Sequence, residues 1–149
     1  SSYLPSEFNA AFLYGQLLNI EMILSARKNA WEYYYSSLEY LANSNEFLLP
    51  RYVSSHNAHI FYLLFESEST LVSLKEFLGS RGVLAITHYV PLHDSPGGIA
   101  FGRSSGDFVN TNAIASGLLR LPLFTEISKR QMNFIISSVE EWTQGYKIA

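Results

Sequence analysis

The sequence predicts a single α+β domain in which a small sheet is covered by helices. A long stretch of helical periodicity opens the chain, two short apolar runs of strand type follow, and two further helical segments close it. The length of 149 residues is the ordinary size of one domain, and an apolar content of 48% is ample for a core. We therefore treat residues 1–149 as one structural unit.

The first element is a helical segment over residues 5–43. Ser6 can act as its N-cap, and Glu7 lies in the first turn, where the helix dipole favours an acid. Its length predicts one long bent helix or two helices with a break. Apolar or small residues recur at helical spacing along two lines, which gives the first half two apolar sides: Phe8, Ala11, Phe12, Gly15, Leu18, Met22 and Ala26, then Leu13, Leu17, Ile20 and Leu24.

The sheet and the remaining helices are predicted over residues 46–149. Residues 59–65 form a continuous apolar run and read as a buried strand, and an amphipathic helix over 71–78 is closed by Gly79 and Gly82. A second strand covers 83–90. The sequence predicts a mainly antiparallel sheet.

A long loop over residues 91–110 follows the second strand, and loops of this length are uncommon without a function or disorder. Thr111 or Asn112 can cap a helix that runs to Leu119, and Pro122 would break it. Ser128 can cap a final helix through Trp142.

Charge and cysteine content exclude several classes. A net charge of −3 without a Lys or Arg run argues against nucleic-acid binding, and the absence of cysteine excludes disulfides and thiolate metal sites. The uncharged stretch over 8–20 is too short for a membrane span, and no signal peptide is visible, so a cytoplasmic location is expected. Charged residues are only 15%, against about 25% in typical domains, which indicates a domain that is covered by partners or cut from a larger protein. A chain that opens on Ser1 fits the second case.

The segment 88–94 (His-Tyr-Val-Pro-Leu-His-Asp) is the main candidate site, because it ends a strand and opens the long loop. His88, His93 and Asp94 carry metal-ligand chemistry, but their spacing matches no ligand motif, and no metal is predicted. The structural interpretation of His88 is a partly buried histidine that is hydrogen-bonded to the backbone. For His93, structural and functional roles are equally open.

Three other features have plain structural interpretations. His56 and His59 diverge on a strand entry, so His59 is expected at the sheet margin. The glycines over 97–106 lack the ending of a phosphate loop, which favours flexibility over a phosphate contact by Arg103. The tyrosines at 33–35 are expected in packing, since consecutive helical positions point around the axis.

Four stretches taken together carry a resemblance to a known family. They are SSYLPSEFNAA at 1–11 followed by Gln16-Leu17, NAHIFY at 57–62, HYVPLH at 88–93 and LLRLPLF at 118–124. In order and spacing the chain resembles the C-terminal part of the DegT/DnrJ/EryC1/StrS sugar aminotransferases, in particular the dTDP-4-amino-4,6-dideoxygalactose transaminases of enterobacterial common antigen and lipopolysaccharide synthesis. The resemblance covers nearly the whole chain.

The resemblance implies the small C-terminal domain of a fold type I enzyme that uses pyridoxal 5'-phosphate as electron sink and works as a homodimer. The implied reaction moves an amino group from glutamate to the 4-keto carbon of dTDP-4-keto-6-deoxyglucose. The family's cofactor lysine and phosphate loop lie in a large domain absent from this sequence, and none of the chain's lysines stands in the required setting. This chain alone is therefore expected to be inactive and not to bind the cofactor, with no catalytic residue of its own.

The resemblance also implies site residues. Tyr89 and His93 match the Tyr-x-Pro-Leu-His element, which in the family lies near the sugar-nucleotide end of the active site, and His88 adjoins them. Ser2 stands where many relatives have an Asn that reaches the cofactor phosphate of the partner subunit. The expected partners are the large domain, a second subunit, the dTDP-sugar and glutamate. A stand-alone dimerisation or binding module with this fold is the alternative; a relative acting on a 3-keto sugar, or as a dehydratase, is a third.

Overall fold

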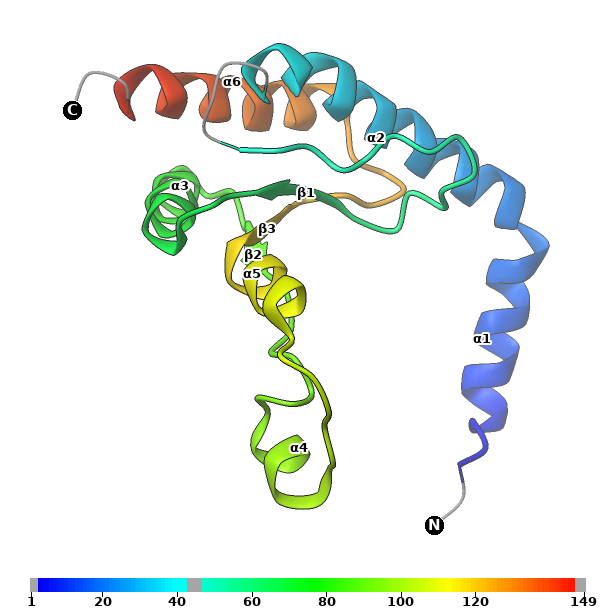
Figure 1. Cartoon of the computed structure of the whole chain (residues 1–149). Helices are drawn as coiled ribbons and strands as arrows, with labels where there is room; N and C mark the ends of the chain where they lie inside the picture. The colour runs from blue at the N-terminus through cyan, green and yellow to red at the C-terminus, as the bar shows by residue number, and fades with distance from the viewer. Residues whose placement is uncertain (1–2, 43–46, 147–149) are drawn as a thin grey trace.

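The computed structural model describes residues 3–42 and 47–146, so Ser2 lies outside the described residues. The elements are α1 (Glu7–Leu18), α2 (Ile20–Ala42), β1 (Phe61–Leu64), α3 (Glu68–Ser80), β2 (Ile86–Thr87), α4 (Pro96–Phe101), α5 (Val109–Gly117), β3 (Leu118–Leu121) and α6 (Lys129–Tyr146). Helices α2 and α6 lie together on one side of the sheet, whereas α1 and the segment with α4 extend away on the other side (Figure 1). The predicted α+β class is confirmed.

The N-terminal helical segment is two helices with a break at Asn19, one of the two forms predicted. The backbone N–H of Asn19 donates to the carbonyl of Gln16, and its side-chain amide donates to the carbonyl of Gly15. These bonds satisfy carbonyls at the end of α1 and let the chain turn into α2. At the other end, Ser6 accepts a hydrogen bond from Asn9 N–H, so the predicted N-cap is confirmed. No residue of α1 is buried.

The sheet has three antiparallel strands in the order β1-β3-β2. Phe61 pairs with Leu121 and Leu64 with Leu118, while Ile86 pairs with Arg120 on the other side of β3. The predicted helix to Leu119 is therefore wrong at its end, since 118–121 form the central strand. Backbone pairing on both edges outweighs the helical propensity of this leucine-rich run.

Three other predicted elements need correction. The strand over 83–90 shrinks to Ile86–Thr87, because the rest finds no strand beside it among the described residues. The helix over 71–78 is longer, Glu68–Ser80; Gly79 lies inside it, and Gly82 adopts the positive φ of 75° just beyond its end. The loop 91–110 contains the short helix α4.

The helix caps show a mixed outcome. Helix α5 begins at Val109, with Phe108 at the N-cap position. Thr111 and Asn112 therefore lie within the helix, and the predicted caps are wrong. The Ser128 hydroxyl accepts from Gln131 N–H, which confirms the cap of the final helix, although that helix continues to Tyr146.

The core lies between the sheet and the pair α2 and α6. Its fully buried large side chains include Tyr34 and Leu38 from α2, Phe61 and Leu63 from β1, Leu119 from β3 and Val139 from α6. The tyrosine cluster serves packing, as predicted: the Tyr34 hydroxyl donates to Pro122 carbonyl at 3.1 Å, and Tyr35 stacks on Trp31. His56 also packs on Trp31, with ring centres 4.2 Å apart.

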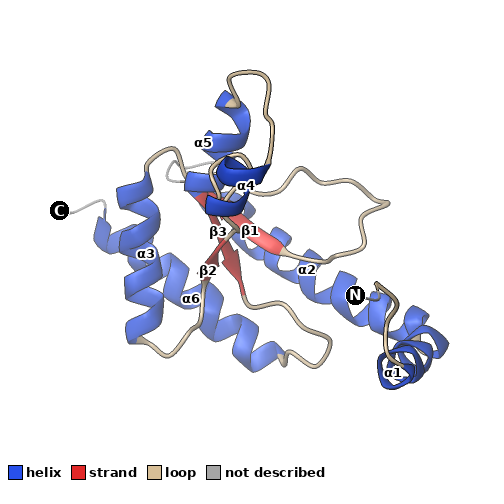
Figure 2. Cartoon of the chain, turned by 90° about the horizontal axis from the view of Figure 1, so that it is seen from below, coloured by secondary structure: helices blue, strands red, loops and turns tan. Residues whose placement is uncertain are grey.

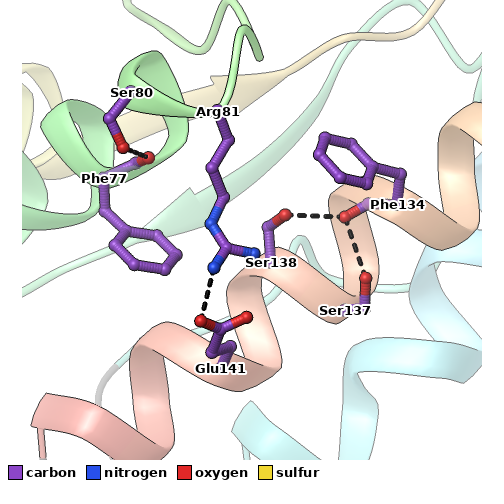
Figure 3. A network of polar contacts seen from close by, with 7 residues as sticks. All are labelled: Phe77, Ser80, Arg81, Phe134, Ser137, Ser138 and Glu141. Atoms are coloured by element: carbon purple, nitrogen blue, oxygen red, sulfur yellow. Dashed lines mark hydrogen bonds and ion pairs between the residues drawn. The ribbon is translucent and has the colours of Figure 1, made fainter.

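Helix α3 is joined to α6 by a polar contact at its C-terminal end (Figure 3). Arg81 forms an ion pair with Glu141 of α6, and its guanidinium lies 4.5 Å from the centre of the Phe77 ring. On α6, the buried Ser138 hydroxyl donates to the carbonyl of Phe134 at 2.7 Å. The ion pair between Arg81 and Glu141 holds α3 in place beside the sheet. No helix in the described part of the chain is long and apolar enough to cross a membrane.

Candidate functional site

A groove of about 730 Å³ lies between α3, the segment that follows β2, and α5. We call it the α3–α5 groove. Its walls are partly apolar, with Leu71 and Val72 from α3 and Val90 and Pro91 from the segment after the strand. The polar side chains that line it are Glu68, Lys75, Thr87, His88, Tyr89, Asp94, Asn112 and Ser116. An amine, two carboxylates and neutral donors in one groove suit a polar ligand rich in hydroxyl groups.

The predicted site segment forms one wall of this groove. His88 and Tyr89 both line it, and their rings are 5.4 Å apart in an edge-to-face arrangement. Both side chains are exposed, so the interpretation of His88 as a half-buried histidine is wrong. Tyr89 is 78% exposed, which leaves its ring accessible to a ligand.

His93 lies behind the groove rather than in its lining. The His93 side chain is only 13% exposed, and its imidazole stacks on the Phe108 ring with centres 4.1 Å apart. Its Nε2 is 2.7 Å from Asn112 Oδ1 and 3.4 Å from Asp94 Oδ2. Since both neighbours of this nitrogen are acceptors, Nε2 carries a proton and donates it to Asn112.

This arrangement orients the Asn112 amide. Because Asn112 Oδ1 accepts from His93, the amide nitrogen of Asn112 points away from His93. Asn112 itself lines the groove. His93 is thus a positioning residue for a hydrogen-bond donor. Sequence reasoning singled out His93 but missed this role, because Asn112 resembled a helix cap and lies 19 residues away in sequence.

Local hydrogen bonds hold the segment between β2 and α5 in shape. The Pro91 carbonyl accepts from the N–H groups of Asp94 and Ser95, and the Ser95 hydroxyl caps α4 by accepting from Gly98 N–H. Gly98 packs so closely that a methyl group there would lie 1.6 Å from the Leu92 carbonyl oxygen. Phe108, at the other end, has a positive φ of 51°. An αL conformation in a bulky residue is costly, and here it places the ring on His93.

The other residues noted in the sequence do not join the site. His59 is exposed at the sheet margin, as predicted, and its carbonyl accepts from Arg27. Arg103 is exposed beyond α4. Across the described ranges, no group of three or more His, Asp and Glu residues could hold a metal ion.

The groove does not fit pyridoxal phosphate by itself. The cofactor needs a lysine together with donors that hold its phosphate. Lys75 lines the groove, but it is accompanied by the carboxylates of Glu68 and Asp94, and no arginine is among the lining residues that the structure describes. Two carboxylates repel a phosphate dianion. This donor set suits a neutral or hydroxylated group.

Comparisons with known proteins agree on one family. Residues 3–140 match the model of the DegT/DnrJ/EryC1/StrS aminotransferase family. The chain is 29% identical over 139 residues to dTDP-4-amino-4,6-dideoxy-D-glucose transaminase of Shigella dysenteriae, an alignment that covers 91% of this chain and 37% of that protein.

Two solved structures have the same fold. The aminotransferase TlmJ from Streptoalloteichus hindustanus superimposes with a TM-score of 0.76 at 20% identity. DesV of S. venezuelae, solved in complex with a ketimine intermediate, gives a TM-score of 0.76 at 26% identity. In each case 89% of this chain and 35% of the other is covered, so the chain spans about a third of the length of the relatives it matches. With a family model matched over nearly all of its length, this chain belongs to the DegT/DnrJ/EryC1/StrS aminotransferase family.

Proposed function

We propose that the chain is the C-terminal domain of a nucleotide-sugar aminotransferase, which moves an amino group from glutamate to the 4-keto carbon of dTDP-4-keto-6-deoxyglucose. The observation that carries this proposal is the 29% identity over 139 residues to a protein named dTDP-4-amino-4,6-dideoxy-D-glucose transaminase. The HYVPLH element at 88–93, which resembles the sugar-nucleotide end of the family's active site, lies along the α3–α5 groove and supports it. A cytoplasmic role in lipopolysaccharide or enterobacterial common antigen synthesis follows from the same resemblance.

In this proposal the α3–α5 groove contacts the hydroxylated sugar ring of the nucleotide sugar, not its diphosphate. His88 and Tyr89 offer exposed rings, and Asn112 offers an amide N–H₂ whose direction is set by His93. A donor of fixed direction can distinguish the positions of sugar hydroxyls, because an unpaired buried donor is costly. His93 then acts on the substrate through Asn112.

The pyridoxal phosphate site is proposed to lie in a large domain and in a second subunit, outside these 149 residues. The carboxylate-rich groove supports this, since it is unsuited to the cofactor phosphate. Ser2 remains a candidate for contact with that phosphate in the partner subunit. The chain alone should then form no borohydride-reducible adduct with pyridoxal phosphate. A stoichiometric adduct would contradict the proposal that the cofactor binds outside this chain.

The test uses the intact enzyme that contains this sequence, loaded with pyridoxal phosphate and supplied with glutamate and dTDP-4-keto-6-deoxyglucose. We expect an amino sugar, and the coupling constants of its C4 proton will distinguish the galacto product, favoured by sequence resemblance, from the gluco product named for the relative. In His93→Ala, KM for the nucleotide sugar should rise at least about tenfold while KM for glutamate stays constant. Unchanged kinetics would remove His93 from the site, and the absence of amino transfer would overturn the function.

A further inference from the structure

A second pocket lies between α2 and the strands of the sheet, and its lining shares no residue with the α3–α5 groove. It has a volume of about 340 Å³ and is lined by residues from α2, from the entry to β1, from β2 and the segment before it, and from β3 with the segment after it. We call it the Arg120 pocket, after the central residue of its basic group. Figure 2 shows the sheet from the side opposite α2 and α6, with α4 and α5 in front of part of it.

The alternation of side chains along the strands places Arg120 on this face. Leu119 and Leu121 are buried towards α2 and α6, so Arg120 between them points to the opposite side. Its partners across the two neighbouring strands are Tyr62 and Ile86. A half-buried arginine thus occupies the middle of the central strand, on the face opposite the core.

Arg120 has no anionic partner within the described residues. In the part of the chain that the structure describes, no carboxylate pairs with Arg120 and no acceptor receives its N–H groups. Its guanidinium carbon lies 5.9 Å from the centre of the Tyr89 ring. Arg81, by contrast, is neutralised by Glu141. A guanidinium has five N–H donors and loses part of its hydration when it is half-buried. Without an acceptor, the half-buried Arg120 guanidinium can therefore still bind an anion.

A second arginine converges on the same pocket. Arg27 donates from Nε to the Ala58 carbonyl at 3.1 Å and from Nη2 to the His59 carbonyl. These two bonds fix the side chain and leave further N–H donors unused. The His59 side chain also lines the pocket, and the lining includes no Asp or Glu among the described residues. In a chain of net charge −3 with only 10 Lys and Arg, this concentration of positive charge is distinctive.

We propose that Arg120 and Arg27 form a binding site for an oxyanion, the phosphate or carboxylate group of a ligand. Paired arginines bind such groups through charge-assisted and often bidentate hydrogen bonds. The identity of the ligand rests on the proposed function, whose substrates carry both chemistries: a diphosphate in the nucleotide sugar and carboxylates in glutamate. Tyr89 contacts Arg120 and also lines the α3–α5 groove, so it connects the two sites.

The site can be tested with the 149-residue chain and inorganic phosphate. The Nε–H signals of the arginines are followed by NMR at constant ionic strength, with chloride as the balancing anion. We expect saturable shifts at Arg120 and Arg27, and at least about tenfold weaker binding in Arg120→Gln. Arg51→Gln, which removes an exposed arginine outside this pocket, is the matched control and should bind as the wild type does.

Shifts that do not saturate, or equal binding in Arg120→Gln, would overturn the site. If Arg120→Gln loses the dispersed spectrum of a folded protein, Arg120→Lys decides the question. It keeps the charge but cannot make the bidentate contact, so at least about threefold weaker binding is expected, and equal binding contradicts the proposal.

Two further titrations identify the ligand. Shifts at Arg120 with dTDP indicate the diphosphate, and shifts with glutamate indicate the amino donor. A response to phosphate alone supports the anion site but contradicts its link to these substrates. The aminotransferase assay on the intact enzyme is independent, so the proposed function can fail while the anion site is supported, and the reverse.

Discussion

His93 donates a hydrogen bond from Nε2 to Asn112 Oδ1 over 2.7 Å, and this contact joins the segment after β2 to helix α5. Phe108 stacks on the His93 imidazole, and the Asp94 carboxylate lies beside His93 Nε2. The result is one wall of the α3–α5 groove with its polar groups fixed in direction. The contact therefore makes a loop histidine the support of an amide that lines the groove.

The Asn112→Ala variant tests this support directly. Without the acceptor, the Nε2–H form of His93 loses its main stabilising contact, and both neutral forms of the ring should be populated. Long-range ¹H–¹⁵N NMR of the imidazole measures this. In the intact enzyme, the same change should raise KM for the nucleotide sugar by about tenfold, the value of one hydrogen bond to a bound ligand.

Thr111→Ala is the control for that change, because Thr111 is exposed on the same helix and does not line the groove. It should leave the ring signals and the kinetics unchanged. A His93 spectrum that is the same in wild type and Asn112→Ala would refute the role of Asn112.

Gly117 is expected to be intolerant of any side chain. A methyl group at this residue would lie 2.2 Å from the carbonyl oxygen of Phe65, where Phe65 N–H bonds to the Gly117 carbonyl. Gly117→Ala should lower the free energy of unfolding by about 1–3 kcal/mol, measured by urea denaturation. Gly79→Ala, on α3 with no atom within 4 Å of the added methyl, should be neutral or stabilising by up to about 1 kcal/mol. Equal effects of the two changes would contradict the packing at the start of β3.

Tyr34 should make the protein sensitive to alkaline pH. Burial raises the pKa of its hydroxyl well above the ordinary value of 10.0. Its contribution to stability is therefore full below pH 10.0 and decreases above it, by about 1.4 kcal/mol per pH unit until the folded-state pKa is reached. The Tyr34→Phe variant lacks this dependence.

At pH 8, Tyr34→Phe should cost about 0.5–1.5 kcal/mol, because the hydrogen bond to the Pro122 carbonyl is lost. At pH 11 the gap to the wild type should shrink. Tyr14→Phe, on the exposed helix α1, serves as the comparison and should preserve the wild-type dependence. A gap that stays constant between pH 8 and 11 would show that Tyr34 titrates normally.

The apolar surface of α1 should make the isolated chain self-associate. Phe8 is 90% exposed and Phe12 is 73% exposed, on a helix with no buried residue. Water-exposed aromatic area favours association by about 25 cal/mol per Å² covered. Sedimentation velocity should show concentration-dependent association in the wild type and its loss in Phe8→Glu with Phe12→Glu. Leu48→Glu, an exposed change outside α1, should associate as the wild type does; a wild type that stays monomeric would contradict the prediction.

Features governed by neighbours in sequence were predicted well. The Ser6 and Ser128 caps act through residues three positions away, and both are confirmed. Two helices with a break, one of the two forms predicted for the long helical segment, and the buried run around Phe61 are also confirmed, since periodicity and apolar runs are local properties. The family resemblance, carried by four short motifs, is confirmed by the family match over residues 3–140.

Features that depend on distant residues were missed. The run Leu118–Leu121 has no local mark of a strand, and it is one because β1 and β2 pair with its two edges. Asn112 resembled a cap and became a helix-interior residue because Phe108, in an αL conformation, begins α5 four residues earlier.

By itself the sequence therefore determined the α+β class, the family and the helix starts at Ser6 and Ser128, and it singled out the segment 88–93 as a candidate site. The tertiary structure decided which strand is central, that His93 supports Asn112 instead of lining the groove, and that Arg120 and Arg27 share a pocket. The physical reason is the range of the interactions. Capping and amphipathic periodicity act within a few residues, whereas strand pairing and the hydrogen bond from His93 to Asn112 join groups that only the folded chain brings together.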